Sequence, residues 1–349
     1  MSKVSIKVKT VSLSLHRCSL AGLLLLLVFT MACESLTSIS QDPPSAATLQ
    51  PQPLGPSGNW KLVFADEFDD TSGSSGPHNG LQASKWNSGW WTGPSSPGVG
   101  TQAVTDPVNK VINYFGPASI IFPGDGALHL RLQRGIDNGG SYNGRHVEWG
   151  MISTAGLLAF NPADVPVSTS NPDLRPYTVN GPCVLEIRMR FPGPNAEADS
   201  YWPGIWLTNA GNYGGSNPAG TAWPGGQTYK EEIDLAESGG GSLGSSYEFH
   251  LHAASEYGGM SSVPSSMQNT DLSTGYHTYT YLFKPSSIQL WVDGIPVTGI
   301  TPTAAQVAAQ WQYPQYLMIT PQAKSGAIYP TSATNQPNDM MIDYVRVWH

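Results

Sequence analysis

Short runs of alternating apolar and polar residues recur along this chain of 349 residues and constrain its fold more than any other feature. A two-residue period predicts antiparallel strands with one buried face. The runs lie at 60–64, 128–132, 184–190, 247–252, 279–283, 288–292 and 341–348. Only the segment 303–311 (TAAQVAAQW) predicts a helix. We therefore expect an all-β sandwich or jelly roll whose C-terminal strand lies inside a sheet.

The composition agrees with many short strands joined by turns. The 38 Gly and 29 Pro supply turn residues, and the 11 Trp within a 40 % hydrophobic chain supply a core, which excludes overall disorder. The formal net charge of −8 argues against a nucleic-acid partner, because phosphates require a basic surface.

The N-terminus has the layout of a secretory signal. Basic residues within the first 17 positions precede the apolar run 20–31 (LAGLLLLLVFTM), which is too short to span a bilayer permanently. We expect residues 1–32 to be removed on export. The sequence TMAC ending at Cys33 resembles a bacterial lipobox, in which the Cys is lipidated, although Thr30 stands where Leu is usual. Secreted and surface-anchored forms both stay open, with membrane attachment only through Cys33.

Residues 33–58 are rich in Ser, Pro and Gln without apolar periodicity, which is typical of a tether. One domain then occupies residues 59–349, and we expect it to be a monomer. Because Cys18 leaves with the signal and a lipidated Cys33 would leave Cys183 alone, the fold cannot depend on a disulfide network.

Four carboxylates fall within residues 231–237 of a chain in which only 12 % of residues are charged. In a regular strand Glu232 and Asp234 share a face, whereas Glu237 has the opposite parity. A β-bulge around residues 235–236 would bring Glu237 to the same face.

Like charges crowded on one face favour a protonated acid beside an ionised carboxylate. Retaining glycoside hydrolysis uses this division between two carboxyl groups about 5–5.5 Å apart. A solvated acidic edge strand and a calcium site are the alternatives that the spacing leaves open.

The string Glu232-Ile-Asp234-Leu-Ala-Glu237 resembles the bulged E-x-D-x-x-E signature of glycoside hydrolase family 16. Flanking segments resemble the family in the same order, at 60–68, 84–87, 126–130, 201–207, 291–294 and 341–347. The resemblance implies a jelly roll of two curved antiparallel sheets with a concave substrate cleft. It also implies retaining hydrolysis of a β-linked polysaccharide, with no cofactor required for catalysis.

By position in the motif, Glu232 would be the nucleophile, Asp234 its hydrogen-bonded partner and Glu237 the general acid/base. The bulged form is typical of laminarinase-like β-1,3-glucanases, agarases and carrageenases, so we expect an endo-acting hydrolase of β-1,3-glucan. The alternatives are a galactan hydrolase of the agarase or carrageenase type, a transglycosylase, and a carbohydrate-binding jelly roll without turnover.

Candidate substrate-binding residues follow from strand parity, aromatic chemistry and the resemblance. They are Glu186, Arg188, Trp202, Trp206, Trp223 and His252. An exposed ion pair is the alternative for the first two, and core packing is the alternative for Trp206. Glu248 and His250 share a strand face with His252, and a structural histidine is the alternative for His250.

The resemblance further implies a structural calcium on the convex side of the sandwich. Its ligands would be Asp343, the backbone near Gly126, and Glu67. The chain departs from the family where Thr320 replaces the Asn that is common there.

Overall fold

The computed structural model describes residues 50–69, 81–88, 104–105, 112–115, 119–134, 146–155, 157–166, 178–192, 203–208, 232–237, 248–252, 274–321 and 338–349. All of them belong to one compact unit, Gln50–His349. The expected signal peptide, Cys33, Trp202 and Trp223 lie outside the described residues. Within the described ranges, no helix has the length and apolarity needed to cross a membrane.

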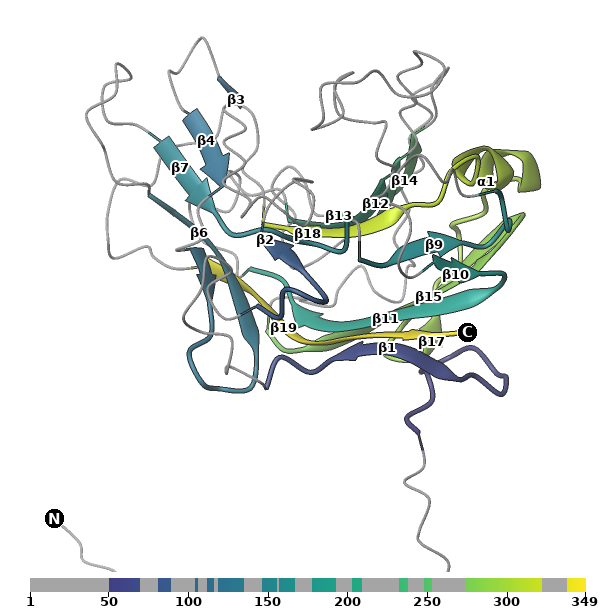
Figure 1. The fold of residues 1–349 in the computed structure, drawn as a ribbon, viewed down its shortest axis with the longest axis horizontal. Coiled ribbons are helices and arrows are strands. Elements are labelled where there is room, and N and C mark those ends of the chain that lie inside the picture. The colour runs from purple at the N-terminus through teal and green to yellow at the C-terminus, as the bar shows by residue number, and fades with distance from the viewer. Residues whose placement is uncertain are drawn as a thin grey trace, which may run out of the picture. The chain divides into compact units, whose positions relative to one another are not determined.

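The larger of two stacked sheets contains eleven strands (Figure 1). They are β1 (Leu62–Asp66), β3 (Val104–Thr105), β4 (Ile112–Phe115), β5 (Ile120–Ile121), β6 (Leu128–Arg134), β7 (His146–Trp149), β11 (Cys183–Arg190), β15 (His277–Lys284), β16 (Ser287–Val292), β17 (Ile295–Pro296) and β19 (Asn338–Trp348). Their order is β17-β16-β15-β11-β19-β6-β7-β4-β3, with β1 paired to β19 and β5 to β6. The C-terminal strand β19 lies inside the sheet, as expected.

The smaller sheet has the order β14-β13-β12-β18-β8-β2. These strands are β2 (Asn87–Ser88), β8 (Ile152–Ser153), β12 (Gly204–Thr208), β13 (Glu232–Glu237), β14 (Glu248–His252) and β18 (Tyr316–Thr320). A separate pair is formed by β9 (Ala159–Asn161) and β10 (Thr178–Asn180). Among the described strands, only β4–β7 and β9–β10 pair in parallel. The predicted all-β jelly roll is confirmed.

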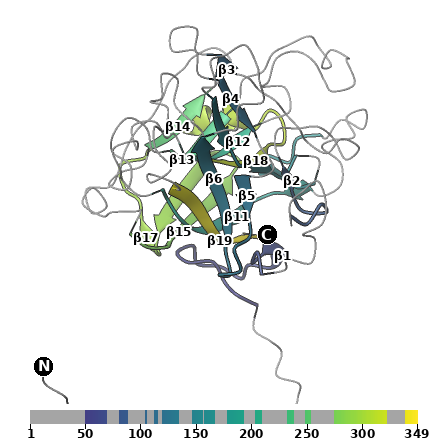
Figure 2. The same ribbon diagram turned by 90° about the vertical axis from the view of Figure 1, so that its left-hand side faces the viewer.

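The main core fills the space between the two sheets. Leu185 and Ile187 of β11 pack in the same cluster as Ile205 of β12 and Ile233 and Leu235 of β13. Figure 2 shows β12, β13 and β18 on one side of β11 and β19. Since side chains alternate along a strand, the even-numbered residues of β11 lie on the outer face of the larger sheet. The free thiol of Cys183 is fully buried in the core, and this burial raises its pKa.

The helix α1 (Ala304–Gln310) forms where the sequence predicts it. Thr303 caps it by accepting a hydrogen bond from the backbone of Gln306, whose side chain accepts from the backbone of Thr303. Val307 is buried in the main core, and the Trp311 ring meets Phe283 edge-on at 5.6 Å. The helix therefore contributes to the core as well as connecting β17 to β18.

The segment 50–61 packs on the outer face of the larger sheet. The indole nitrogen of Trp348 donates to the carbonyl of Pro51 at 2.7 Å. Gly55 has φ +109°, and a Cβ there would lie 2.5 Å from the ring of Trp291. Only glycine adopts this positive φ without strain and leaves room for the Trp291 ring. The domain therefore begins at Gln50, so residues 50–58 belong to the folded unit rather than to the expected tether.

We predict that Ile187→Ala lowers the free energy of unfolding by about 2–5 kcal/mol, because it removes a fully buried side chain between the sheets. Chemical denaturation should measure this loss. The matched control is Gln289→Ala on an exposed position of β16, for which we expect a change within about 0.5 kcal/mol. A similar small change in both variants would contradict this placement of the core.

Candidate active site

The acidic strand β13 contains the bulge that the sequence predicts. Across β14, Asp234 pairs with His250, and the next register pair joins Glu237 to Glu248. Two residues of β13, Leu235 and Ala236, thus face one residue of β14. The pairing with β12 shifts at the same place.

The bulge separates the acids of β13 from its apolar residues. Ile233, Leu235 and Ala236 are fully buried in the core between the sheets. Asp234 is 2 % exposed, whereas Glu232 and Glu237 are partly exposed. The three acids therefore lie away from the core, around the two histidines of β14.

His252 and Asp234 are directly linked within this cluster. Their Nε2 and Oδ2 atoms are 2.8 Å apart, across the strand pair. The hydrogen bond to Asp234 raises the pKa of His252, against the effect of burial, and the charges of Asp234, Glu232 and Glu237 add to the increase. This hydrogen bond holds Asp234 in place beside Glu232.

His250 occupies the other half of the cluster. Its Nε2 lies 3.0 Å from Oε2 of Glu248 and 4.0 Å from Oε2 of Glu237. Its ring stacks on that of His252, with 5.8 Å between centroids. The shared parity of residues 248, 250 and 252 indicated this face, but sequence reasoning did not connect Glu248 with Glu237.

One atom from each of Glu232, Asp234 and His252 lies within 4.8 Å of the others, close enough to hold a divalent cation. A metal ion there would compete with the existing hydrogen bond between Asp234 and His252.

Trp206 lies next to the acids but is largely buried. It pairs with Asp234 across β12 and β13, so both side chains are on the same face. The ring is 6 % exposed, and its Nε1 donates to Oγ1 of Thr320 at 3.2 Å. A Cβ at Gly204 would lie 3.5 Å from Trp206 and 3.7 Å from Glu237, so this glycine leaves space beside both.

The expectation that Glu186 and Arg188 line the cleft with the acids is wrong. Both belong to β11, on the outer face of the larger sheet, whose opposite face packs against β13. Arg188 forms an ion pair with Asp343 instead. Strand parity showed that the two residues share a face but could not show which sheet contained them.

Glu186 has a structural role on that outer face. Its carboxylate, 1 % exposed, accepts from the backbone of Leu54 at 2.6 Å and from the hydroxyls of Thr280 and Tyr344 at 2.9 Å each. Burial and the nearby carboxylate raise the pKa of Tyr344, which keeps its hydroxyl protonated as a donor. This carboxylate fastens the segment 50–61 to the sheet.

The two carboxylates expected to bind calcium are each paired with an arginine. Asp343 pairs with Arg188, and Glu67 accepts two hydrogen bonds from Arg346 at 2.8 and 2.7 Å. A calcium ion at these carboxylates would have to compete with both arginines, and the calcium site stays a prediction.

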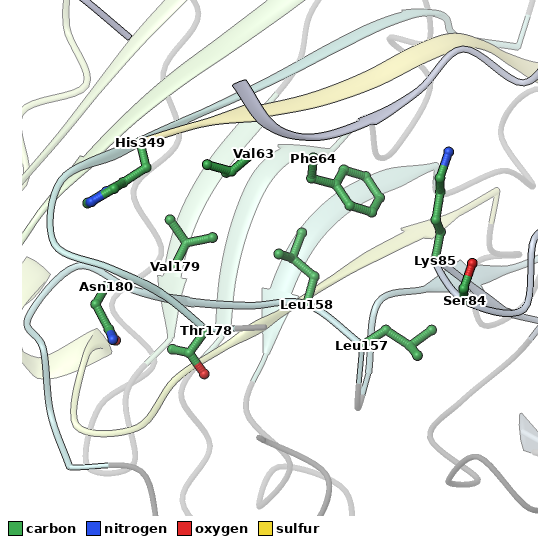
Figure 3. Close-up of a pocket in the computed structure, with 10 residues that line it drawn as sticks. All are labelled: Val63, Phe64, Ser84, Lys85, Leu157, Leu158, Thr178, Val179, Asn180 and His349. Atoms are coloured by element: carbon green, nitrogen blue, oxygen red, sulfur yellow. The ribbon is translucent and has the colours of Figure 1, made fainter. Parts of the chain in front are cut away.

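A separate cavity of about 560 Å³ lies between β1, β10 and the segment 84–85 (Figure 3). Phe64, Leu158 and Val179 form much of its lining, and Lys85 stands at one end. Lys85 is 3.7 Å from Asp66. None of the three acids of β13 contributes to this cavity, so it is distinct from the acidic cluster.

Residues 204–346 match the family model described as Glycosyl hydrolases family 16. The matched segment runs from β12 into β19 and contains all of β13. No curated protein matches the chain.

Several solved structures are similar over most of the chain. The endo-β-1,3-glucanase from Pyrococcus furiosus is 21 % identical, with a TM-score of 0.53 and coverage of 83 % of this chain and 94 % of that one. The laminarinase catalytic domain from Thermotoga maritima is 19 % identical, with a TM-score of 0.53 and coverage of 83 % and 98 %. The endo-1,3-β-glucanase from Streptomyces sioyaensis is 23 % identical, with a TM-score of 0.51 and coverage of 85 % and 99 %. The shared fold and the family match support a glycoside hydrolase.

We predict that the stabilising effect of His252 depends on pH. Because its pKa is raised in the folded protein, the effect is fully present below the unfolded value of about 6.5 and is lost as the pH rises through the folded value. Urea denaturation of wild type and His252→Gln across this range should show the difference in stability shrinking with increasing pH. A difference that grows with pH would contradict the link to Asp234.

We predict that Glu186→Ala costs about 3 kcal/mol of stability, since it leaves two buried hydroxyls and one partly buried backbone N–H without their acceptor. Glu186→Gln keeps one acceptor oxygen and should cost less. Thermal or chemical denaturation measures both losses. If Glu186 instead bound sugar, both variants would weaken oligosaccharide binding while leaving stability unchanged.

Proposed function

We propose that the protein is a retaining endo-glycoside hydrolase that cleaves β-linked glucan, with β-1,3-glucan as the main substrate. The observation that carries the proposal is the bulged strand β13, which gathers Glu232, Asp234 and Glu237 beside His252. Two carboxyl groups in different surroundings are what double displacement at an anomeric carbon requires.

In the first step, a carboxylate oxygen of Glu232 forms a bond to the anomeric carbon as the glycosidic bond breaks. Glu237 gives its proton to the departing oxygen. In the second step, Glu237 takes a proton from water, whose oxygen attacks the anomeric carbon and releases Glu232. Each step inverts the anomeric centre, so the product keeps the β configuration.

Asp234 supports this chemistry from between the two glutamates. Its link to His252 fixes the Asp234 carboxylate against the sheet, 2.8 Å from a nitrogen that can carry positive charge. A fixed negative charge beside Glu232 favours the positive charge that develops on the sugar in the transition state.

The preference for β-1,3-glucan rests on the similar solved structures, which are described as endo-β-1,3-glucanases or a laminarinase. The bulge at residues 235–236 agrees with it, because bulged members of family 16 include laminarinase-like enzymes. Long polysaccharides stay outside cells, and this agrees with export through residues 1–32. Retention at the surface through Cys33 is part of the same proposal.

We predict that wild type releases reducing sugars from laminarin faster than from agarose. Glu232→Gln should abolish release, and Glu237→Gln should lower it by about 10²–10⁴-fold, the usual contribution of a general acid/base. Chromatography of early products should show several chain lengths, as expected for endo cleavage. Proton NMR should show the β anomer forming first.

The matched control is Glu67→Gln on the outer face, where Glu67 pairs with Arg346. This variant should keep wild-type rates. Equal activity of wild type and Glu232→Gln would overturn the proposal. Tight oligosaccharide binding by an inactive wild type would favour a binding module instead.

A further inference from the structure

Two glutamates face each other across the strand pair at the edge of the acidic cluster. Glu237 and Glu248 are direct register partners of β13 and β14. Like charges in this position repel each other. His250 lies between them, with Nε2 3.0 Å from Glu248 and 4.0 Å from Glu237.

Two more residues of the same strand pair lie beside His250. Asp234 is its register partner, and the ring of His252 stacks on it. The side chains of both His250 and Glu237 are 17 % exposed, whereas that of Glu248 is 37 % exposed. Solvent therefore screens the two inner groups less than it screens Glu248.

We propose that His250 is a positioning residue for the general acid/base Glu237. By bonding Glu248, His250 engages the carboxylate that would otherwise accept a hydrogen bond from the protonated carboxyl group of Glu237. The proton of Glu237 then points to the glycosidic oxygen instead of across the strand pair. The inference rests on the proposed function and adds a role that the acid triplet does not contain.

The test exploits the leaving group. Departure of a sugar alkoxide needs protonation by Glu237, whereas departure of a nitrophenolate needs little help. His250→Gln should lower kcat/KM on laminarin oligosaccharides by about tenfold, and on the matching β-nitrophenyl glycoside by less than twofold. A merely structural defect would lower both rates alike.

A second substitution tests the mechanism itself. Adding Glu248→Gln to His250→Gln removes the opposing carboxylate, so the double variant should recover most of the lost rate on the oligosaccharide. If His250→Gln does not fold, the double variant alone tests the role of His250. The quantity to compare with wild type is its kcat/KM on the oligosaccharide divided by its kcat/KM on the nitrophenyl glycoside. A ratio close to that of wild type supports the inference, and a low ratio overturns it.

Two controls accompany these variants. His277→Gln removes a histidine that pairs with Asp293 at 2.7 Å on the larger sheet, and it should keep both rates. Glu237→Gln should show a stronger form of the same dependence on the leaving group. An inactive wild type would refute the proposed function itself. An active wild type with an equal loss on both substrates, no loss in His250→Gln, or no rescue by Glu248→Gln would overturn only the role of His250.

Discussion

The site depends on one extra residue in strand β13. Five steps separate Glu232 from Glu237, an odd number that would put these acids on opposite faces of a regular strand. The bulge lets residues 235–236 face a single residue of β14, so Glu237 returns to the face of Glu232 while Leu235 and Ala236 both stay in the core. Without it, one end of the acid triplet would point into an apolar layer, where an ionised group is costly.

The neighbouring strands make this irregularity stable. β13 is the second strand of its sheet, paired on one side with β12 and on the other with β14, and both partners change register at the bulge. β14 supplies the imidazoles of His250 and His252, which lie among the carboxylates. The same strand pair that carries the crowded carboxylates therefore also supplies imidazoles that pair with them.

Much of the fold and the arrangement of the acids could be predicted from the sequence, because both follow from local periodicity. The strands, the helix α1 and the bulge each depend on a few neighbouring residues. The positions of Glu186 and Arg188 depend instead on which sheet contains β11 and which of its faces packs inward. The alternation of polar and apolar residues along β11 is the same whether its polar face lines the cleft or lies on the outer face. The assignment of strands to sheets is a long-range property. The sequence pattern therefore could not show that Glu186 and Arg188 lie on the outer face of the larger sheet.

The segment 50–58 shows a second limit of composition. Its Pro, Gln and Gly residues are typical of a tether, yet Leu54 and Gly55 fit against Glu186 and Trp291. A few specific contacts with an already folded sheet order a segment that could not bury enough apolar surface alone. The composition of a segment indicates whether it would be ordered in isolation. It does not reveal whether another part of the chain offers a complementary surface.

Glu186 and Glu237 have different roles because their surroundings differ: Glu186 is structural, and Glu237 is the proposed general acid/base. Three donors surround Glu186, one of them from a distant segment, so its oxygens are committed to holding that segment. Glu237 faces another carboxyl group across the strands, with an imidazole between them. The same residue type is thus a structural anchor on one face of the domain and a member of an acidic cluster on another.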